Sequence, residues 1–323
     1  MKQTKDYQLF FSIQSKISKI PFNQSFAWYN YLGCENITFF YDDDINPSLC
    51  FWGRERRIPF TNKLFLDIQG EAYSESLSDS QFTKLYSSLI NLNYSAIEIN
   101  SNNQYHIEYE IGIRRAGFKR PIGLFSCPLT IYVNFNEEFN FDRNWKRNLR
   151  KAIDSELIFD ELESVSDEEI HKIVYIFKEM SELKKLRYLL NFDSVKKLVK
   201  SDNIRTFIVK KSQGSILSAR IIFDLNGYAY DVFAANSIQA RECGASYFIM
   251  DSIFNLLKSE NKVLFDFGRI PPSKTASDSV YLFKNATRGK RIQYNGEWVF
   301  YKNQLLELII FIYKMFRLKL QRY

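Results

Sequence analysis

Residues 263–303 read VLFDFGRIPPSKTASDSVYLFKNATRGKRIQYNGEWVFYKN, the most informative stretch of the chain. Its first five residues are apolar except for Asp266, and Gly268 closes the run, so they predict a short buried strand. A loop rich in Pro, Ser and Thr follows, and then come Phe283 and Lys284, a basic cluster and the segment YNGEW. Because Asp266 interrupts an apolar strand, we expect its carboxylate to face a polar cleft or to pair with a nearby cation.

The residues before this stretch alternate between helix and strand patterns. In chain order we expect a helix at 143–153, a strand near 157–159, helices at about 166–185 and 194–200, strands at 205–211, 216–224 and 228–235, and a helix at about 241–258. Ser166 and Glu169 have the spacing of a capping box, and Asn226 with Gly227 is typical of a hairpin turn. This order predicts an α/β lobe in the second half of the chain.

The first half shows patterns of the same kind. In order we expect strands at 37–41 and 63–68, a helix at 79–90, a strand at 96–99, a helix that ends near Arg115 before Gly117, and a strand at 129–135. These elements are compatible with a degenerate copy of the second-half plan. We therefore predict an α/β (α+β) protein with lobes at 1–140 and 141–303 and a tail helix at 304–323.

The composition is that of an ordinary globular protein. The 323 residues suffice for two domains of about 150 residues each. Four cysteines, Cys34, Cys50, Cys127 and Cys243, lie far apart without CxxC spacing, so we expect reduced thiols rather than disulfides or a zinc site. The N-terminal residues contain no apolar segment of signal-peptide length, so we expect a cytoplasmic protein.

The positive charge is concentrated at one end of the chain. Residues 284–323 contain nine Lys and Arg but only two Glu, an excess that equals the net charge of +7 for the whole chain. The remaining residues are therefore electrically balanced, which argues against nucleic-acid binding as the primary function. A local excess instead suggests a phosphate-bearing ligand, an anionic membrane surface, or both.

The order DFG, loop, FK, basic cluster and NGEW resembles the C-terminal signature of the Fem-type transferases and of related GNAT-like acyltransferases from cell-envelope and polysaccharide gene clusters. Gln24–Trp28, Pro128–Val133 and Asn144–Ala152 are similar to three further Fem-type motifs. The resemblance implies two GNAT-like lobes with mixed, largely antiparallel sheets flanked by helices. It also implies a transferase that moves an acyl or aminoacyl group onto an amine of an envelope or surface-polysaccharide precursor.

The resemblance assigns catalysis to the FK pair, because in Fem-type enzymes this lysine faces the acyl ester. It implies that Lys284 supports negative charge during transfer and that Phe283 belongs to the donor site. Amine attack on an ester or thioester produces an oxyanion, which a desolvated ammonium stabilises. The alternative is a solvated lysine in a basic loop. Asp266 is the second catalytic candidate, although a structural hydrogen-bonding role is favoured over that of a general base.

The segment Arg241–Ser246 nearly fits the GNAT pyrophosphate loop, with Ser246 where Gly or Ala is usual. The resemblance therefore implies that Arg241, Gly244 and Ser246 bind the donor. The free N–H groups and the dipole of a glycine-opened helix start attract phosphate. The alternative is an ordinary helix start with a permissive glycine.

Further cations are candidates for binding the acceptor or another anion. Arg147, Arg150 and Lys151 share one face of the expected helix at 143–153, so they can converge on one anion. The alternative is a solvated helix face. Arg187 is a weaker candidate of the same kind.

We expect no metal and no permanently bound cofactor, since His106 and His171 are the only histidines. The co-substrate is expected to be an acyl-CoA, an acyl-carrier thioester or an aminoacyl-tRNA. The acceptor is expected to be a sugar nucleotide or a lipid-linked glycan. Two departures weigh against a muropeptide: no cation follows Trp28, where Fem enzymes that act on such substrates commonly have a lysine, and residues 166–200 lack a long helical arm.

The tail at 304–323 predicts a cationic amphipathic helix, too short and too charged to span a bilayer. Such a helix can lie in the membrane interface, which favours a peripheral position on the inner face of the membrane. Docking on the protein's own core or on a second subunit is the alternative, and the oligomeric state stays open. A different class of function is a non-catalytic Fem-like scaffold that the tail recruits to the membrane.

Overall fold

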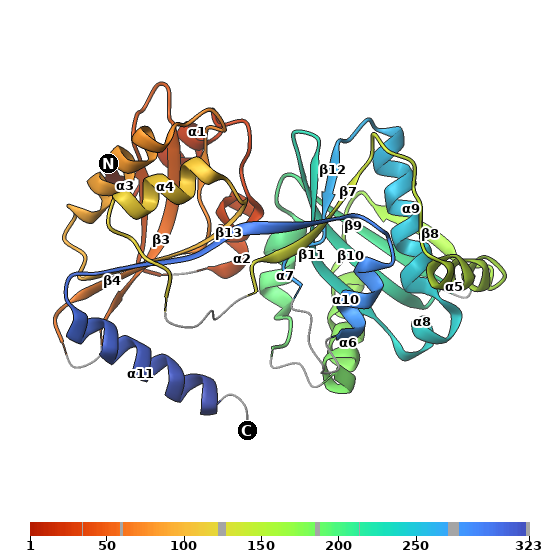
Figure 1. Ribbon diagram of the computed structural model, residues 1–323. Helices are drawn as coiled ribbons and strands as arrows, with labels where there is room; N and C mark the ends of the chain where they lie inside the picture. The colour runs from red at the N-terminus through yellow and green to blue at the C-terminus, as the bar shows by residue number, and fades with distance from the viewer. Residues whose placement is uncertain are drawn as a thin grey trace. The chain divides into compact units, whose positions relative to one another are not determined.

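The computed structural model describes residues 1–33, 35–58, 61–121, 127–184, 188–212, 214–270 and 278–320, the side chains of 278 and 317–320 excepted. Two compact units share the chain (Figure 1). Unit 1 consists of Met1–Gln24, Cys34–Pro128 and Gln293–Tyr323, and unit 2 of Ser25–Gly33 and Leu129–Ile292. The expected lobes were continuous segments that met at residue 140, whereas each unit combines separate stretches of the chain.

Unit 1 is built on a mixed sheet with strand order β1-β2-β3-β4-β6-β13, and β5 pairs with β3. The bounds are β1 (Lys2–Thr4), β2 (Ile37–Tyr41), β3 (Leu49–Arg57), β4 (Leu64–Ile68), β5 (Ala72–Tyr73), β6 (Ala96–Gln104) and β13 (Lys290–Tyr301). Its pairs are antiparallel except β4 with β6. The helices are α1 (Tyr7–Gln14), η1 (Phe22–Gln24), α3 (Asp79–Ile90), α4 (Ile107–Arg115) and α11 (Gln304–Leu320). No helix in the described ranges is long and apolar enough to cross a membrane.

Unit 2 has a second mixed sheet, with strand order β7-β12-β11-β10-β9-β8. The bounds are β7 (Leu129–Asn134), β8 (Ile158–Leu162), β9 (Ile204–Lys210), β10 (Ile216–Leu225), β11 (Tyr228–Asn236) and β12 (Leu264–Asp266). Its pairs are antiparallel except β11 with β12. The helices are α2 (Phe26–Leu32), α5 (Arg143–Ile153), α6 (Asp167–Lys184), α7 (Phe192–Val199), α8 (Ile238–Cys243), α9 (Ala245–Ser259) and α10 (Asp278–Asn285).

The apolar face of α9 anchors the core of unit 2. Ile249, Ile253 and Leu257 recur at the four-residue spacing of one helix face, and all are fully buried. Phe254 packs edge-on against Phe265 of β12, with ring centroids 5.2 Å apart. Parallel strands need a crossover connection, and α8 with α9 supply it between β11 and β12. This packing fixes the strand from which the candidate site is built.

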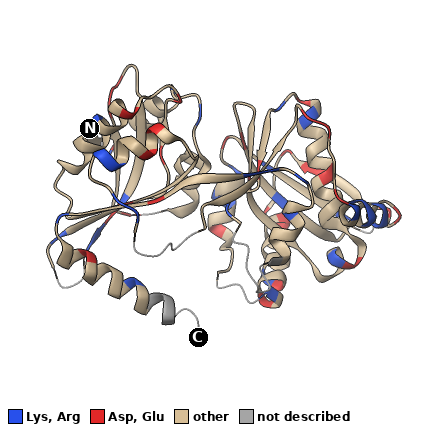
Figure 2. Ribbon diagram, viewed as in Figure 1, with Lys and Arg blue, Asp and Glu red and all other residues tan. Residues whose placement is uncertain are grey.

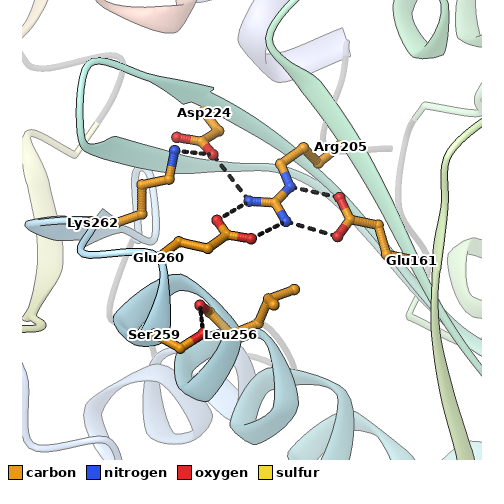
Figure 3. A network of polar contacts seen from close by, with 7 residues as sticks. All are labelled: Glu161, Arg205, Asp224, Leu256, Ser259, Glu260 and Lys262. Carbon is orange, nitrogen blue, oxygen red and sulfur yellow. Dashed lines mark hydrogen bonds and ion pairs between the residues drawn. The ribbon is translucent and has the colours of Figure 1, made fainter.

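A charged network closes the far end of the same sheet (Figure 3). Arg205 of β9 makes two-pronged contacts to Glu161 of β8, at 2.6 and 2.7 Å, and to Glu260, at 2.6 and 2.8 Å. It also contacts Asp224 of β10 at 3.1 Å, and Lys262 contacts the same carboxylate at 2.8 Å. Two-pronged guanidinium–carboxylate pairs are geometrically specific, so Arg205 of β9 links β8 and β10 to the C-terminal end of α9.

The predicted fold class is confirmed, since both sheets are mixed, largely antiparallel and flanked by helices. The strand at 37–41 and the helices at 79–90 and 143–153 have the expected bounds. The helix expected at 241–258 is instead two helices, α8 and α9, because Gly244 takes a left-handed conformation with φ of 76°. Lys284 lies on α10 rather than in a loop. Cys50, Cys127 and Cys243 form no disulfide with one another, and Cys34 lies outside the described residues.

Candidate active site

Lys284 is buried although it carries an amine. Its residue is 9% exposed, and Nζ donates to the carbonyl oxygen of Phe267 at 2.5 Å. Burial lowers the pKa of Lys284 to about 8, and the charge of Asp231 opposes that shift. Oδ2 of Asp231 lies 4.0 Å from Nζ. Lys284 is therefore a desolvated cation whose charge only neighbouring dipoles and carboxylates balance.

Arg220 and Asp231 form a buried ion pair beside Lys284. Arg220 of β10 donates from Nη1 to Oδ2 of Asp231 on β11 at 2.6 Å, and their side chains are 4% and 5% exposed. The opposing atoms, Nε of Arg220 and Oδ1 of Asp231, have no hydrogen-bond partner among the described residues. Each buried charge thus keeps one unused hydrogen-bonding position.

Asp266 orders the turn that presents the carbonyl group of Phe267 to Lys284. Its Oδ1 accepts from Oγ1 of Thr130 at 2.6 Å and from the N–H of Gly268 at 2.8 Å. Gly268 has a φ of 69°, and a Cβ there would lie 2.8 Å from the hydroxyl of Tyr230. These bonds suit the structural role that the sequence favoured, and the charge of Asp266 also opposes the lowered pKa of Lys284. A role as general base stays a prediction.

More cations lie within electrostatic reach of this cluster. Burial lowers the pKa of Lys184 at the end of α6, and the charges of Arg241 and Arg220 lower it further. Arg241 is exposed on α8, so it offers its guanidinium to solvent. Lys184 and Arg241 therefore add positive charge beside the Arg220–Asp231 pair.

Gly244 has a packing role that the sequence did not reveal. It ends α8 and precedes α9, and a Cβ there would lie 2.5 Å from the carbonyl oxygen of Asn148 on α5. The glycine therefore permits close approach of two helices as well as a left-handed turn. Ser246 is half-buried in the first turn of α9. Donor phosphate binding by Gly244 and Ser246 stays a prediction.

The basic face of α5 is exposed. Figure 2 shows the run of Lys and Arg along this helix in blue. Arg147, Arg150 and Lys151 are all exposed, and Arg147 donates to Oδ1 of Asn144 at 2.7 Å. Burial raises the pKa of Tyr247 in the first turn of α9, and the charge of Arg147 opposes that shift. The anion candidates of α5 therefore lie beside the predicted donor loop. Arg187 lies outside the described residues.

Phe283 belongs to an aromatic cluster that borders the ion pair. Its ring centroid lies 4.9 Å from that of Trp145 and 5.0 Å from that of Tyr247. The guanidinium carbon of Arg220 lies 5.8 Å from the Phe283 centroid, within the range of a cation–π contact. Phe283 thus links the core of unit 2 to the charged cluster, and its predicted contact with the donor stays a prediction.

The sequence interpretation did not single out Arg220 and Asp231. A signal was available for Asp231, since it is the one charged residue of β11, which is the pattern that drew attention to Asp266. Arg220 shares β10 with a second charge, Asp224. Among the residues with described positions, no group of three or more His, Cys, Asp or Glu side chains could hold a metal ion.

Solved structures resemble this chain over nearly its whole length. FemX is 11% identical, with a TM-score of 0.77 over 96% of this chain and 100% of FemX. L-PGS from Bacillus licheniformis is 13% identical, with a TM-score of 0.64 over 94% of this chain and 96% of L-PGS. A tandem GNAT protein from the clavulanic acid biosynthesis pathway is 6% identical, with a TM-score of 0.51 over 94% of this chain and 99% of that protein.

Sequence comparison adds nothing to this result, since no protein-family model and no curated protein matches the chain. At identities this low, the structural likeness is a statement about the fold. It agrees with the motif order read from the sequence. This chain therefore has a Fem-type, GNAT-like fold.

Proposed function

We propose that this protein transfers an acyl or aminoacyl group from a carrier to an amine of a cell-envelope or surface-polysaccharide precursor. The carrier is an acyl thioester or an aminoacyl-tRNA. The observation that carries the proposal is the buried ammonium of Lys284, which is held by the carbonyl group of Phe267 and faces Asp231. The Fem-type, GNAT-like fold supports the reaction class.

The chemistry needs a stabilised oxyanion and little else from the side chains. The amine nitrogen attacks the carbonyl carbon, a C–N bond forms, and the carbonyl oxygen becomes an oxyanion. Collapse of this adduct breaks the C–O or C–S bond to the carrier. Lys284 stabilises the oxyanion, because a charge in a water-poor site acts more strongly than the same charge in solvent. Electropositive side chains around Lys184 and Arg241 suit a phosphate-bearing carrier.

The test is transfer of a labelled acyl group from acyl-CoA, or of a labelled amino acid from charged tRNA, to amino sugars. Wild-type protein should transfer label, and Lys284→Met should reduce kcat by roughly 100-fold or more, as loss of an oxyanion donor does. Lys290→Met is the matched control, since Lys290 is exposed in the same basic stretch. Full activity of Lys284→Met would remove Lys284 from catalysis. Vesicle binding by a protein without affinity for thioesters or tRNA would favour the scaffold.

A peripheral position on the membrane is part of the proposal, and α11 supports it. Leu306 and Ile310 face inward and pack with Ile58 and Ala96, while Glu307 pairs with Lys119 at 2.5 Å. The helix therefore docks on unit 1 by one face. Among the other large apolar side chains that the structure describes on this helix, Phe311 is half-buried and seven are exposed: Leu305, Leu308, Ile309, Ile312, Tyr313, Met315 and Phe316.

The surroundings of this apolar face favour an anionic lipid surface as its occupant. Lys302 precedes α11, and Arg57 and Lys63 flank Ile58, which packs against the helix. All three cations are exposed. An apolar helix face with a basic rim suits the headgroup region of a membrane with negative lipids.

Vesicle cosedimentation tests this position. The protein should bind vesicles that contain phosphatidylglycerol more tightly than pure phosphatidylcholine vesicles, and Ile312→Ser with Phe316→Ser should weaken binding. Tyr175→Ser is the control, because Tyr175 is exposed on α6. A double variant that binds vesicles like wild type would contradict the lipid contact. A wild-type dimer that this variant dissociates would point to a second copy as the occupant.

A further inference from the structure

We infer that Asp231, held by Arg220, is the subsite for the attacking nitrogen, and that the acceptor is a primary amine rather than an alcohol. This inference rests on the proposed transferase function. It assigns to Asp231 a hydrogen bond from the amine and receipt of the proton that the nitrogen loses.

The unused atoms of the ion pair point to a missing ligand. Oδ2 of Asp231 is satisfied by Arg220, whereas Oδ1 has no hydrogen-bond partner among the described residues. With a side chain 5% exposed, this oxygen has little access to water. A buried polar atom left without a partner costs about 1–3 kcal/mol, and an N–H donor bound there removes that cost.

The distance to Lys284 matches the geometry of acyl transfer. In the tetrahedral adduct, the oxyanion and the attacking nitrogen are bonded to the same carbon, so the groups that contact them must lie side by side. Nζ of Lys284 and Oδ2 of Asp231 are 4.0 Å apart. An ammonium for the oxyanion and a carboxylate for the nitrogen are therefore available at adjacent positions.

Amine chemistry fits this charge pattern. When a neutral amine attacks, its nitrogen becomes cationic and far more acidic as the C–N bond forms. Asp231 accepts one N–H proton, and its negative charge stabilises the developing positive charge before transfer. As the carrier bond breaks, its electron pair leaves with the carrier oxygen or sulfur, which takes that proton from Asp231. The bonds formed and broken and the transferred proton therefore balance without a further reactant.

Aromatic side chains beside Asp231 reinforce the preference for a cation-forming group. The charge of Asp231 contributes to the raised pKa of Tyr188, so the two groups lie within electrostatic reach. The ring of Phe177 lies 5.5 Å from that of Tyr188 and 6.5 Å from that of Phe233 on β11. The ring of Tyr31 packs against this group at a tilt, 5.3 Å from that of Phe233. Aromatic faces near a carboxylate are typical of sites that bind amines and ammonium groups.

Steady-state kinetics with a matched pair of acceptors test the inference. Wild-type protein should transfer label to glucosamine and not to glucose, and Asp231→Asn should lower kcat for glucosamine by roughly 100-fold or more. Asp251→Asn, at a half-buried carboxylate on α9, is the control and should keep wild-type kcat. A folded Asp231→Asn protein with kcat close to wild type would overturn the inference. So would equal transfer to glucose.

Arg220 is a positioning residue in this scheme, and its test separates orientation from folding. Arg220→Lys keeps a cation beside Asp231 but loses the planar guanidinium, so KM for glucosamine should rise more than kcat falls. Arg220→Met should lower kcat as well, since Asp231 then lacks its counter-charge. Identical kinetics for both variants would show that the ion pair stabilises the fold and that Arg220 does not position Asp231.

A binding measurement separates failure of this inference from failure of the transferase proposal. Butylammonium chloride should raise the Tm of wild-type protein relative to an equal concentration of sodium chloride, because the ammonium can donate an N–H hydrogen bond to Oδ1 and sodium cannot. Asp231→Asn should lose that shift and Asp251→Asn should keep it. With no transfer to any acceptor, a retained and Asp231-dependent shift would leave the amine subsite standing while the reaction assignment falls. An equal shift in Asp231→Asn would reject the subsite.

Discussion

Burial of Lys284 should make the free energy of unfolding depend on pH. The side chain lies in a residue 9% exposed, and its pKa is about 8 instead of 10.5. Because the folded-state value lies below the unfolded-state value, the unfolded chain binds more protons between these pH values, and stability rises as pH rises through this window. The shift corresponds to a cost of about 3 kcal/mol for burying the ammonium at about pH 7, and about 1.4 kcal/mol at about pH 9.5.

Lys284→Met isolates this cost. Methionine keeps an unbranched apolar stem and removes the amine, together with its hydrogen bond to the carbonyl group of Phe267. The lost hydrogen bond also changes the unfolding free energy of the variant, by an amount that varies little with pH. The difference in unfolding free energy, variant minus wild type, should therefore fall by about 2 kcal/mol between about pH 7 and about pH 9.5. Other lysines and the tyrosines titrate in both proteins, so their contributions cancel.

Urea unfolding followed by tryptophan fluorescence, at several pH values across this window, measures the difference. Lys290→Met is the control, because its lysine is exposed and should give a difference that does not change with pH. If the difference for Lys284→Met is equally flat, the lysine titrates near its ordinary pKa. Lys284 would then not be a desolvated ammonium.

Three further outcomes follow from described contacts. If the ammonium of Lys284 supports the oxyanion, kcat should fall as pH rises through about 8, and a kcat that stays level past this pH would show that the charge is not needed. Gly244→Ala should lower the unfolding free energy by about 2–4 kcal/mol in urea unfolding, because it adds left-handed strain and a clash with Asn148. Gly214→Ala is the control: a Cβ there meets no atom within 4 Å, so only the left-handed strain should lower the unfolding free energy. Arg205→Met should lower the unfolding free energy by about 2–4 kcal/mol, because its carboxylate partners lose their shared cation, and a smaller loss measured the same way would mean that water replaces the guanidinium.

Local signals in the sequence predicted the elements that carry the site. The helix at 143–153 follows from its periodicity, and its start is fixed by Asp142, whose side chain accepts from the N–H of Trp145 at 2.7 Å. The strand around Asp266 follows from its apolar run. Lys284 was found through motif order, since nothing in the residues around it shows that its amine is buried.

What the sequence did not predict depends on contacts between distant residues. Arg220 and Asp231 lie on neighbouring strands, and only the pairing of β10 with β11 brings the two charges together. The strand β13 was not expected, because its partner β6 lies almost two hundred residues earlier, with Tyr294 opposite Gln104. The close approach at Gly244 depends on Asn148 of another helix.

The discontinuous make-up of the units has a consequence for biosynthesis. Unit 2 can complete its contacts once residue 292 has been made, but unit 1 also needs residues 293–323. Until β13 arrives, one edge of β6 offers unpaired N–H and C=O groups, which invite pairing with other chains. We therefore expect unit 2 to fold before unit 1 during synthesis. When the chain is truncated after residue 292, we expect unit 1 to aggregate.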